Sequence, residues 1–212
     1  MMFCTLSDVK TLLGIPADDT TQDDKLNLLI KNTSAKIESY IGYSLSRNTY
    51  TDEIQAVNNR QLLQLNHFPL QSVSSVTIDG NAIDDYKLFP EYQFWGRLYR
   101  GLGWCGNYYT RGFTHDVVSG AWVIVVSYIA GYYLPGDTGY VEGNPDSLPS
   151  DIYSACLDEV VYRYNAEQTG AIGIKSHSEG HISETYTDDA STTSLSASCR
   201  KLIDKYRWVG LA

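Results

Sequence analysis

The sequence predicts an α+β fold, mainly a helical core of about four helices with an inserted antiparallel β-rich module. Apolar residues recur at three-and-four spacing near both ends of the 212-residue chain, which indicates helices there. Between the two helical parts the pattern changes to short alternating runs, which indicates strands. We therefore expect residues 1–46 and 148–212 to form the helical core, and residues 47–147 to form the inserted module.

The first helical part is expected to hold two helices. Thr5 with Asp8 forms a capping pair for a helix over residues 6–13, and Gly14 ends that helix. A longer helix is expected over residues 23–41, because its charged residues fall outside one apolar face. That face consists of Leu26, Leu29, Ile30, Thr33, Ile37, Tyr40 and Ile41.

The inserted module is expected to hold short strands joined by turns. The Asp-Gly-Asn sequence at 79–81 indicates a turn. Residues 121–128 form the most apolar run, and its continuity predicts a strand that is buried on both faces. The expected strands are 61–65, 73–78, 85–89, 96–100 and 121–128, of which 85–89 and 96–100 can pair as a hairpin.

Helix signals return after a link rich in glycine and proline. Ser150 can cap a helix and Asp151 favours its positive end, and this helix should end before Gly170. A last helix follows, whose apolar residues lie four, seven, eight and eleven positions after Leu195. The predicted buried stripe of this helix is Leu195, Cys199, Leu202, Ile203 and Tyr206.

The polar stretch 171–191 is expected to protrude from the core as an arm, because it lacks a strong core pattern. Its candidate contact residues are Ile174, Ile182 and Tyr186, and the last two fall on the same side of a possible strand. An arm of this kind can add a strand to a neighbouring subunit through main-chain hydrogen bonds. Plain surface disorder is the alternative for this stretch.

Composition favours a protein that neither enters a membrane nor grips nucleic acid. Sixteen basic and twenty-five acidic residues give a net charge of −9, which opposes tight binding to phosphate backbones. The longest apolar run, 121–130, is too short to span a bilayer, and no signal peptide is evident. The four cysteines stand far apart without a CxxC pair, so we expect free buried thiols and a reducing place of synthesis.

No motif in the sequence predicts catalysis, a metal or a cofactor. His177 and His181 stand four residues apart, but the glycines and serines around them oppose the helix that a metal site of this spacing requires. The adjacent acid pairs lie near turns and helix starts, where acidic caps are ordinary. A nucleophile elbow, a P-loop and a dinucleotide fingerprint are all absent from the sequence. We therefore predict a non-enzymatic protein that needs no cofactor and no metal.

Two aromatic groups are candidate contact surfaces. In the module, the aromatic residues fill the core and contact a neighbour, or they line a sugar-binding groove. At the chain end, aromatic and apolar residues anchor an interface with a partner, or they pack against the helical core. The first group is Trp95, Tyr99, Trp104, Tyr108 and Tyr109, and the second is Tyr206, Arg207, Trp208, Val209 and Leu211.

Several segments, in this order and spacing, resemble one known family. They are Leu6-Ser7-Asp8-Val9-Lys10 with Leu12-Leu13-Gly14, then residues 63–70 with 73–80, then Val126-Ser127-Tyr128-Ile129-Ala130-Gly131-Tyr132, and then Leu148-Pro149-Ser150-Asp151-Ile152. The sequence resembles the head-to-tail connector proteins of tailed bacteriophages, also called adaptor or head-completion proteins. Residues 92–113 depart from that family's pattern.

The resemblance implies a structural subunit of the virion neck that is made in the host cytoplasm. It implies a homo-oligomeric ring of about twelve copies below the phage portal protein. The ring would extend the DNA channel and offer a docking surface to the next neck or tail protein, and DNA would pass through without specific binding. The chain end is the expected portal interface. The alternative function is an aromatic-rich carbohydrate-binding module of a virion or cell surface.

Overall fold

The computed structural model describes residues 1–56, 60–104, 122–168, 176–179, 182–185 and 195–208. The chain divides into two compact units, and each is described by itself. The helical unit comprises Met1–Tyr43 and Tyr133–Ala212, and the β unit comprises Ser44–Tyr132. Residues 133–147 thus belong with the helices, where Tyr133 pairs with Ser147 before the next helix begins. The α+β class predicted from the sequence is confirmed.

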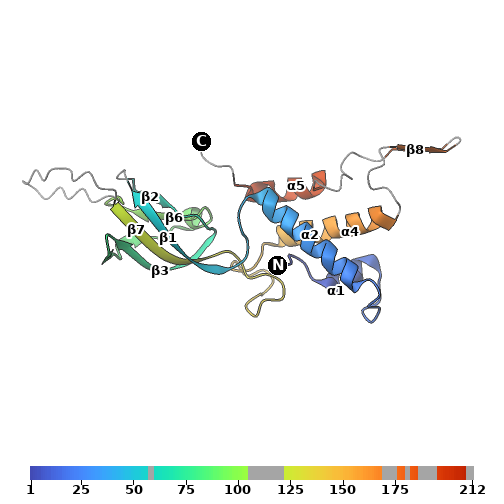
Figure 1. Ribbon diagram of the computed structural model, residues 1–212, viewed down its shortest axis with the longest axis horizontal. Helices are drawn as coiled ribbons and strands as arrows, with labels where there is room; N and C mark the ends of the chain where they lie inside the picture. Colours follow the sequence, from blue (N-terminus) through green and yellow to red (C-terminus); the bar gives the residue numbers. More distant parts are fainter. Residues whose placement is uncertain (57–59, 105–121, 169–175, 180–181, 186–194, 209–212) are drawn as a thin grey trace, which may run out of the picture. The chain divides into compact units, whose positions relative to one another are not determined.

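The described residues of the helical unit form four α-helices, and the first two begin and end where the sequence predicts (Figure 1). The Thr5 hydroxyl accepts a hydrogen bond from the Asp8 amide at 3.2 Å, which is the expected cap. Gly14 ends this helix with φ of 68°, a left-handed conformation that suits glycine. The helices are α1 (Leu6–Leu13), α2 (Asp23–Ile41), α4 (Ser150–Gln168) and α5 (Ala197–Ile203), and a 3-10 turn, η2 (Asp204–Tyr206), extends α5.

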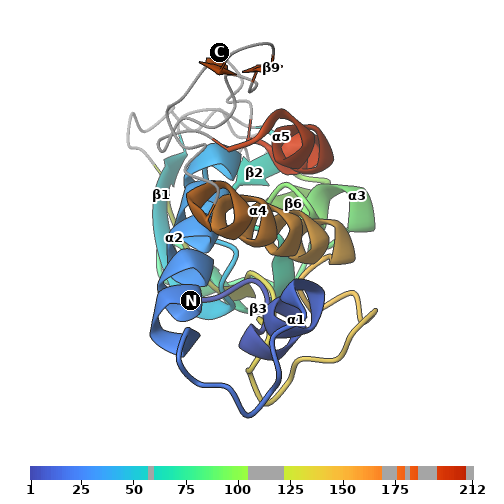
Figure 2. The ribbon, with the colours of Figure 1, turned by 90° about the vertical axis from the view of Figure 1, so that its right-hand side faces the viewer.

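Helix α4 is the common partner of the other three helices (Figure 2). Its residues Ile152, Cys156 and Val160 have no exposed surface, and α1, α2 and α5 all contact α4. The α2 face that meets this core includes Leu26, Ile30, Ile37 and Ile41, which are also fully buried. The core therefore joins residues from before and after the β unit.

The buried stripe predicted for the last helix is correct except at one residue. Leu195, Cys199, Ile203 and Tyr206 are buried, but Leu202 is 42% exposed. Successive residues on an α-helix lie 100° apart, so Leu202 and Ile203 cannot both face the narrow contact with α4. Ile203 packs in the contact with α4, and Leu202 points toward solvent.

The β unit contains two antiparallel sheets. The four-stranded sheet has the order β1-β7-β3-β4, and the three-stranded sheet has the order β2-β6-β5. A single core cluster takes buried residues from both sheets, among them Leu63 and Leu98 from one and Val76 and Val126 from the other. The elements are β1 (Asn48–Ala56), β2 (Leu62–Gln64), β3 (Leu70–Ile78), β4 (Asn81–Ala82), β5 (Tyr86–Lys87), α3 (Pro90–Gln93), β6 (Arg97–Arg100) and β7 (Trp122–Ala130).

The β unit confirms the expected strands, corrects one expectation about burial and adds one strand. The hairpin of 85–89 with 96–100 is present as β5 and β6, and a short helix, α3, lies between its strands. Strand β7 was expected to be buried on both faces, but only alternate residues from Ile124 to Ala130 are buried. The residues between them are half-buried, because this sheet packs against the second sheet on one face only. The sequence pattern does not predict strand β1.

The two chain passages that enter and leave the β unit lie against each other. Ser46 forms a bridge with Tyr132, and the Arg47 amide donates to the Tyr132 carbonyl at 3.0 Å. Gly131 has φ of 92°, and a Cβ there would lie 2.4 Å from the Ser46 carbonyl oxygen. Glycine is therefore required at this crossing. Among the described residues, no helix is long and apolar enough to cross a membrane.

The α2 face offers a matched test of the helical core. Leu26→Ala should destabilise the protein by about 2–5 kcal/mol, because Leu26 is fully buried and its loss leaves a cavity. Leu28→Ala, on the same helix, removes a side chain that is 58% exposed and should change stability by less than about 0.5 kcal/mol. Urea unfolding measures both free energies. Equal losses in the two variants would contradict the described orientation of α2.

Candidate functional site

The chain end after α5 folds back onto the helical unit. The Trp208 amide donates a hydrogen bond to the Ile41 carbonyl at 2.8 Å, which ties this segment to the end of α2. Tyr206 is only 8% exposed, and its hydroxyl lies 3.4 Å from an Asp151 carboxylate oxygen. Burial raises the pKa of the Tyr206 hydroxyl, so it stays protonated as a donor. Within the described residues Tyr206 thus packs inside its own unit.

Two other residues of the expected portal interface remain at the surface. Arg207 is exposed, and its guanidinium carbon lies 5.3 Å from the centre of the Tyr40 ring. Trp208 is half-buried. Val209 and Leu211 lie outside the described residues. The surface that this segment offers therefore includes a cationic residue over the Tyr40 ring and a half-buried tryptophan next to it in the chain.

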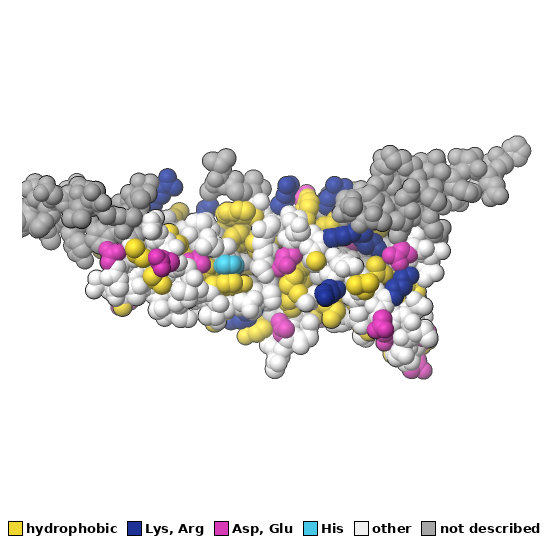
Figure 3. Space-filling model, viewed as in Figure 1, with side chains coloured by type: hydrophobic (Ala, Val, Ile, Leu, Met, Phe, Trp, Pro, Cys, Tyr) yellow, Lys and Arg dark blue, Asp and Glu magenta, His cyan; other side chains and the backbone are white. Residues whose placement is uncertain are grey.

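Basic residues surround this chain end. Between 200 and 207 the chain carries Arg200, Lys201, Lys205 and Arg207 but only one acidic residue, Asp204. Figure 3 shows dark blue side chains gathered over the α2 and α5 part of the helical unit. Lys205 also pairs with Asp151 at the start of α4. In a chain with a net charge of −9, this local excess of positive charge marks a distinct surface.

A buried glutamate fixes where α5 begins. The Glu159 side chain on α4 is fully buried and accepts a hydrogen bond from the Ser196 hydroxyl at 2.5 Å. The Arg163 guanidinium, one turn further along α4, donates to the other Glu159 oxygen at 2.7 Å. Ser196 also caps α5 by accepting from the Cys199 amide at 3.3 Å. This charge network therefore positions the helix that leads to the chain end.

The arm contains a small hairpin of its own. Strands β8 (Ser176–Glu179) and β9 (Ile182–Thr185) pair antiparallel, with Glu179 opposite Ile182. Of the expected contact residues, Ile182 is therefore the first residue of a strand, whereas Ile174 and Tyr186 lie outside the described residues. The possible strand that the sequence indicated after residue 179 is present as β9.

Of the module's described aromatic residues, one lies in the core and two are partly exposed. Trp104 is 1% exposed, and its indole nitrogen donates to the Gln61 carbonyl at 3.0 Å, so it is a core residue. Trp95 and Tyr99 are half-buried, and Trp95 packs edge-on against Phe94 at 4.8 Å. Tyr108 and Tyr109 lie outside the described residues. A buried Trp104 has no free ring face for a sugar to stack on.

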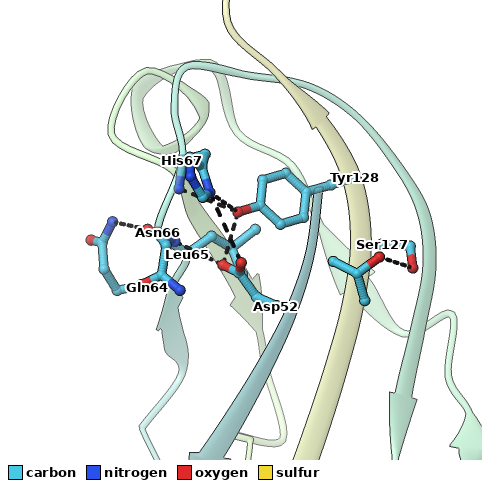
Figure 4. A network of polar contacts seen from close by, with 8 residues as sticks. Asp52, Gln64, Leu65, Asn66, His67, Ser127 and Tyr128 are labelled. Atoms are coloured by element: carbon cyan, nitrogen blue, oxygen red, sulfur yellow. Dashed lines mark hydrogen bonds and ion pairs between the residues drawn. The ribbon is translucent and has the colours of Figure 1, made fainter. Parts of the chain in front are cut away.

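A polar network inside the β unit was not found from the sequence. Asp52 on β1 is 6% exposed, and it accepts hydrogen bonds from the Tyr128 hydroxyl and from the Asn66 amide, both at 2.8 Å (Figure 4). The Tyr128 oxygen in turn accepts from the His67 amide at 3.2 Å. The His67 ring stacks on Tyr50 with centroids 3.7 Å apart. The alternation of Tyr50, Asp52 and Ile54 with exposed residues is the signal that could have revealed β1.

This network holds structure rather than reactive groups. Burial and the hydrogen bond to Asp52 raise the pKa of Tyr128 above its usual range, so the hydroxyl remains a donor. The described cysteines are similar, since burial raises the pKa of the Cys199 thiol to about 12. Such groups are poor nucleophiles and poor bases at neutral pH. Among the described residues, no group of three or more His, Cys, Asp or Glu residues could hold a metal ion.

A model of the family described as "Head completion protein" matches residues 2–209. The chain belongs to the head completion protein family. It is thus a structural, non-enzymatic protein, and the resemblance seen in the sequence is confirmed. None of the curated proteins compared matches the chain.

Two solved structures share the fold of this head completion protein. One chain is from the structure described as the neck of an empty GTA particle computed with C6 symmetry, with a TM-score of 0.51 and 13% identity. That alignment covers 97% of this chain and 90% of the other. A chain from the virion of a native gene transfer agent (GTA) particle gives a TM-score of 0.50 and 16% identity, over 97% and 89% of the two chains.

The polar network yields a prediction for stability. Tyr128→Phe should cost about 1–3 kcal/mol, because it removes a donor to the buried Asp52 and leaves the His67 amide without its acceptor. Tyr86→Phe is the matched control, since Tyr86 is half-buried in the same unit and its hydroxyl forms no hydrogen bond with another described residue. Chemical denaturation followed by tryptophan fluorescence compares the two. A loss in the control as large as in Tyr128→Phe would contradict the role of the network.

Proposed function

We propose that this chain is a head-to-tail adaptor in the neck of a tailed-phage-like particle. About twelve copies form a ring below the portal, extend the DNA channel and provide the docking surface for the next neck or tail protein. The family match over residues 2–209 is the observation that carries this proposal. The shared fold with a neck chain from a particle computed with C6 symmetry supports it, because a ring of twelve is compatible with sixfold symmetry.

Neighbouring copies are proposed to join through the arm, with strand β1 as the acceptor. Among the described residues β1 pairs on one side only, with β7, and its nine-residue register contains no bulge. Strand β3 differs, because its register with β7 shifts at two places. Residues 48–56 also contain no lysine, arginine or proline, which commonly protect edge strands. A strand from the neighbour's 176–185 hairpin would continue this sheet by main-chain hydrogen bonding.

The portal contact is proposed at the basic chain end. Arg207, exposed beside the Tyr40 ring, and half-buried Trp208 have the side-chain types that dominate protein interfaces. The fixed position of α5 keeps this segment in one place on each copy. A ring would therefore present these residues repeatedly to an acidic portal surface. DNA passes the ring without specific binding, because the chain as a whole is acidic.

Replacement of residues 176–185 by a glycine-serine linker of equal length should abolish the ring. The linker keeps the chain length but removes the proposed added strand. Light scattering and negative-stain imaging measure the assembly state. The variant should remain folded, with the far-UV circular dichroism of its helices retained, because β8 and β9 form a two-stranded sheet of their own.

Hydrogen exchange then tests the acceptor strand. Amides of residues 48–56 that face away from β7 should be protected in the parent ring and exchange rapidly in the linker variant. Rings that form normally without the hairpin would refute the arm proposal. A ring that is lost while exchange in 48–56 is unchanged would place the acceptor elsewhere.

Arg207→Glu should weaken binding to a purified portal ring at least about tenfold, because charge reversal at an interface costs more than about 1.4 kcal/mol. Lys87→Glu is the matched control, since Lys87 is exposed on β5, outside the basic residues 200–207, and its reversal changes the net charge equally. Biolayer interferometry measures both affinities. An equal loss in the two variants would indicate general electrostatic attraction instead of a portal contact at residue 207.

A further inference from the structure

Two buried thiols from distant parts of the sequence meet in the helical unit. The sulfur atoms of Cys4 and Cys156 lie 3.7 Å apart, although 152 positions separate the residues. Cys4 is 1% exposed and Cys156 has no exposed surface. Cys4 precedes α1, and Cys156 lies in the buried face of α4. Nothing in the proposed ring assembly uses this pair.

The surroundings hold both thiols in place. The Ser34 hydroxyl on α2 lies 3.6 Å from the Cys156 sulfur and donates to the Ile30 carbonyl at 2.8 Å. The Phe3 amide, next to Cys4, donates to the same Ser34 oxygen at 3.0 Å. A disulfide bond is about 2.05 Å long, so the sulfurs need to approach by less than about 2 Å. Rotation about the side-chain bonds can supply an approach of this size.

We propose that Cys4 and Cys156 form a redox modification site, at which a low-molecular-weight disulfide oxidant converts the two thiols into an intramolecular disulfide. The Cys4 thiolate attacks one sulfur of the oxidant and releases one reagent thiol, which leaves a mixed disulfide on Cys4. The Cys156 thiolate then attacks the Cys4 sulfur and releases the second reagent thiol. Two protein S–H bonds are lost and one S–S bond forms, and the oxidant takes up two electrons and two protons.

The closed structure makes this reaction slow. The hydrogen bond with Cys156 and burial both raise the pKa of the Cys4 thiol far above its usual range, so little thiolate is present. Reaction therefore requires local opening of the segment before α1. Opening breaks the bond from Phe3 to Ser34 and exposes Cys4, while Met1 and Met2 are already exposed. The pair thus remains reduced in a reducing compartment and oxidises slowly outside it.

The disulfide would join the start of the helical unit to its central helix. It closes a loop that contains α1, α2 and the whole β unit, and the entropy lost by the unfolded chain grows with loop length. The expected rise in melting temperature is on the order of 10 °C. This timing rests on the proposed function: in a particle that is released from the cytoplasm, the disulfide would form after assembly.

The test uses the full-length protein incubated with oxidised glutathione at pH 8. Free thiols are then alkylated in denaturant, and the protein is digested without reduction and analysed by mass spectrometry. We expect a cross-linked peptide pair containing Cys4 and Cys156, and a melting temperature that rises with oxidation and falls again with dithiothreitol. Alkylation of both residues, or glutathione on either residue without the cross-link, would overturn the proposal.

Two variants separate this site from other thiols. Cys4→Ser should abolish both the cross-link and the rise in melting temperature, whereas Cys199→Ser, which removes another buried thiol, should retain both. If Cys4→Ser lowers stability by itself, the cross-link in the unaltered protein still decides the question. Ring assembly of the reduced protein is measured in parallel. If the reduced protein does not form a ring, the proposed function is contradicted, but the disulfide result still stands.

Discussion

The buried face of α4 is the contact on which the helical unit depends. Ile152, Cys156 and Val160 are fully buried there, and α1, α2 and α5 all pack on this helix. Two of these helices precede the β unit in the chain and one follows it. The core therefore forms only if the chain leaves the β unit close to the point at which it enters that unit. The crossing at Gly131 and Ser46 meets this requirement, because no side chain at 131 holds the two passages apart.

The buried charge of Glu159 on α4 has a structural role. Glu159 is tolerated in the core because Ser196 and Arg163 satisfy its oxygens, and an unpaired carboxylate there would be strongly destabilising. The same bonds specify where α5 starts and thus where the chain end emerges. In the proposed ring every contact would repeat on each copy, so a reproducible surface would be needed. A buried charge whose hydrogen bonds are all formed fixes the position of a helix more precisely than apolar packing, because apolar packing permits small shifts.

The β unit also contains a buried carboxylate with several hydrogen bonds, on the edge strand β1. Asp52 receives hydrogen bonds from Tyr128 on β7 and from the Asn66 amide, which lies in the connection between β2 and β3. The network thus links β1 to the strand beside it and to the connection that joins the two sheets. These bonds hold β1 firmly, while its edge away from β7 pairs with no other strand of the described residues. A rigid strand with one open side is suited to accept another strand.

The sequence by itself determined the elements whose signals are local. The caps and periodicity of α1 and α2 predict their ends correctly, because the Thr5 and Gly14 conformations depend on neighbouring residues alone. The order of segments also identified the family. The tertiary structure alone decided which of Leu202 and Ile203 is buried, which face of β7 meets the core, and that Asp52, Tyr128 and His67 meet. These outcomes depend on contacts between residues far apart in the chain, and the spacing within a short segment does not encode them.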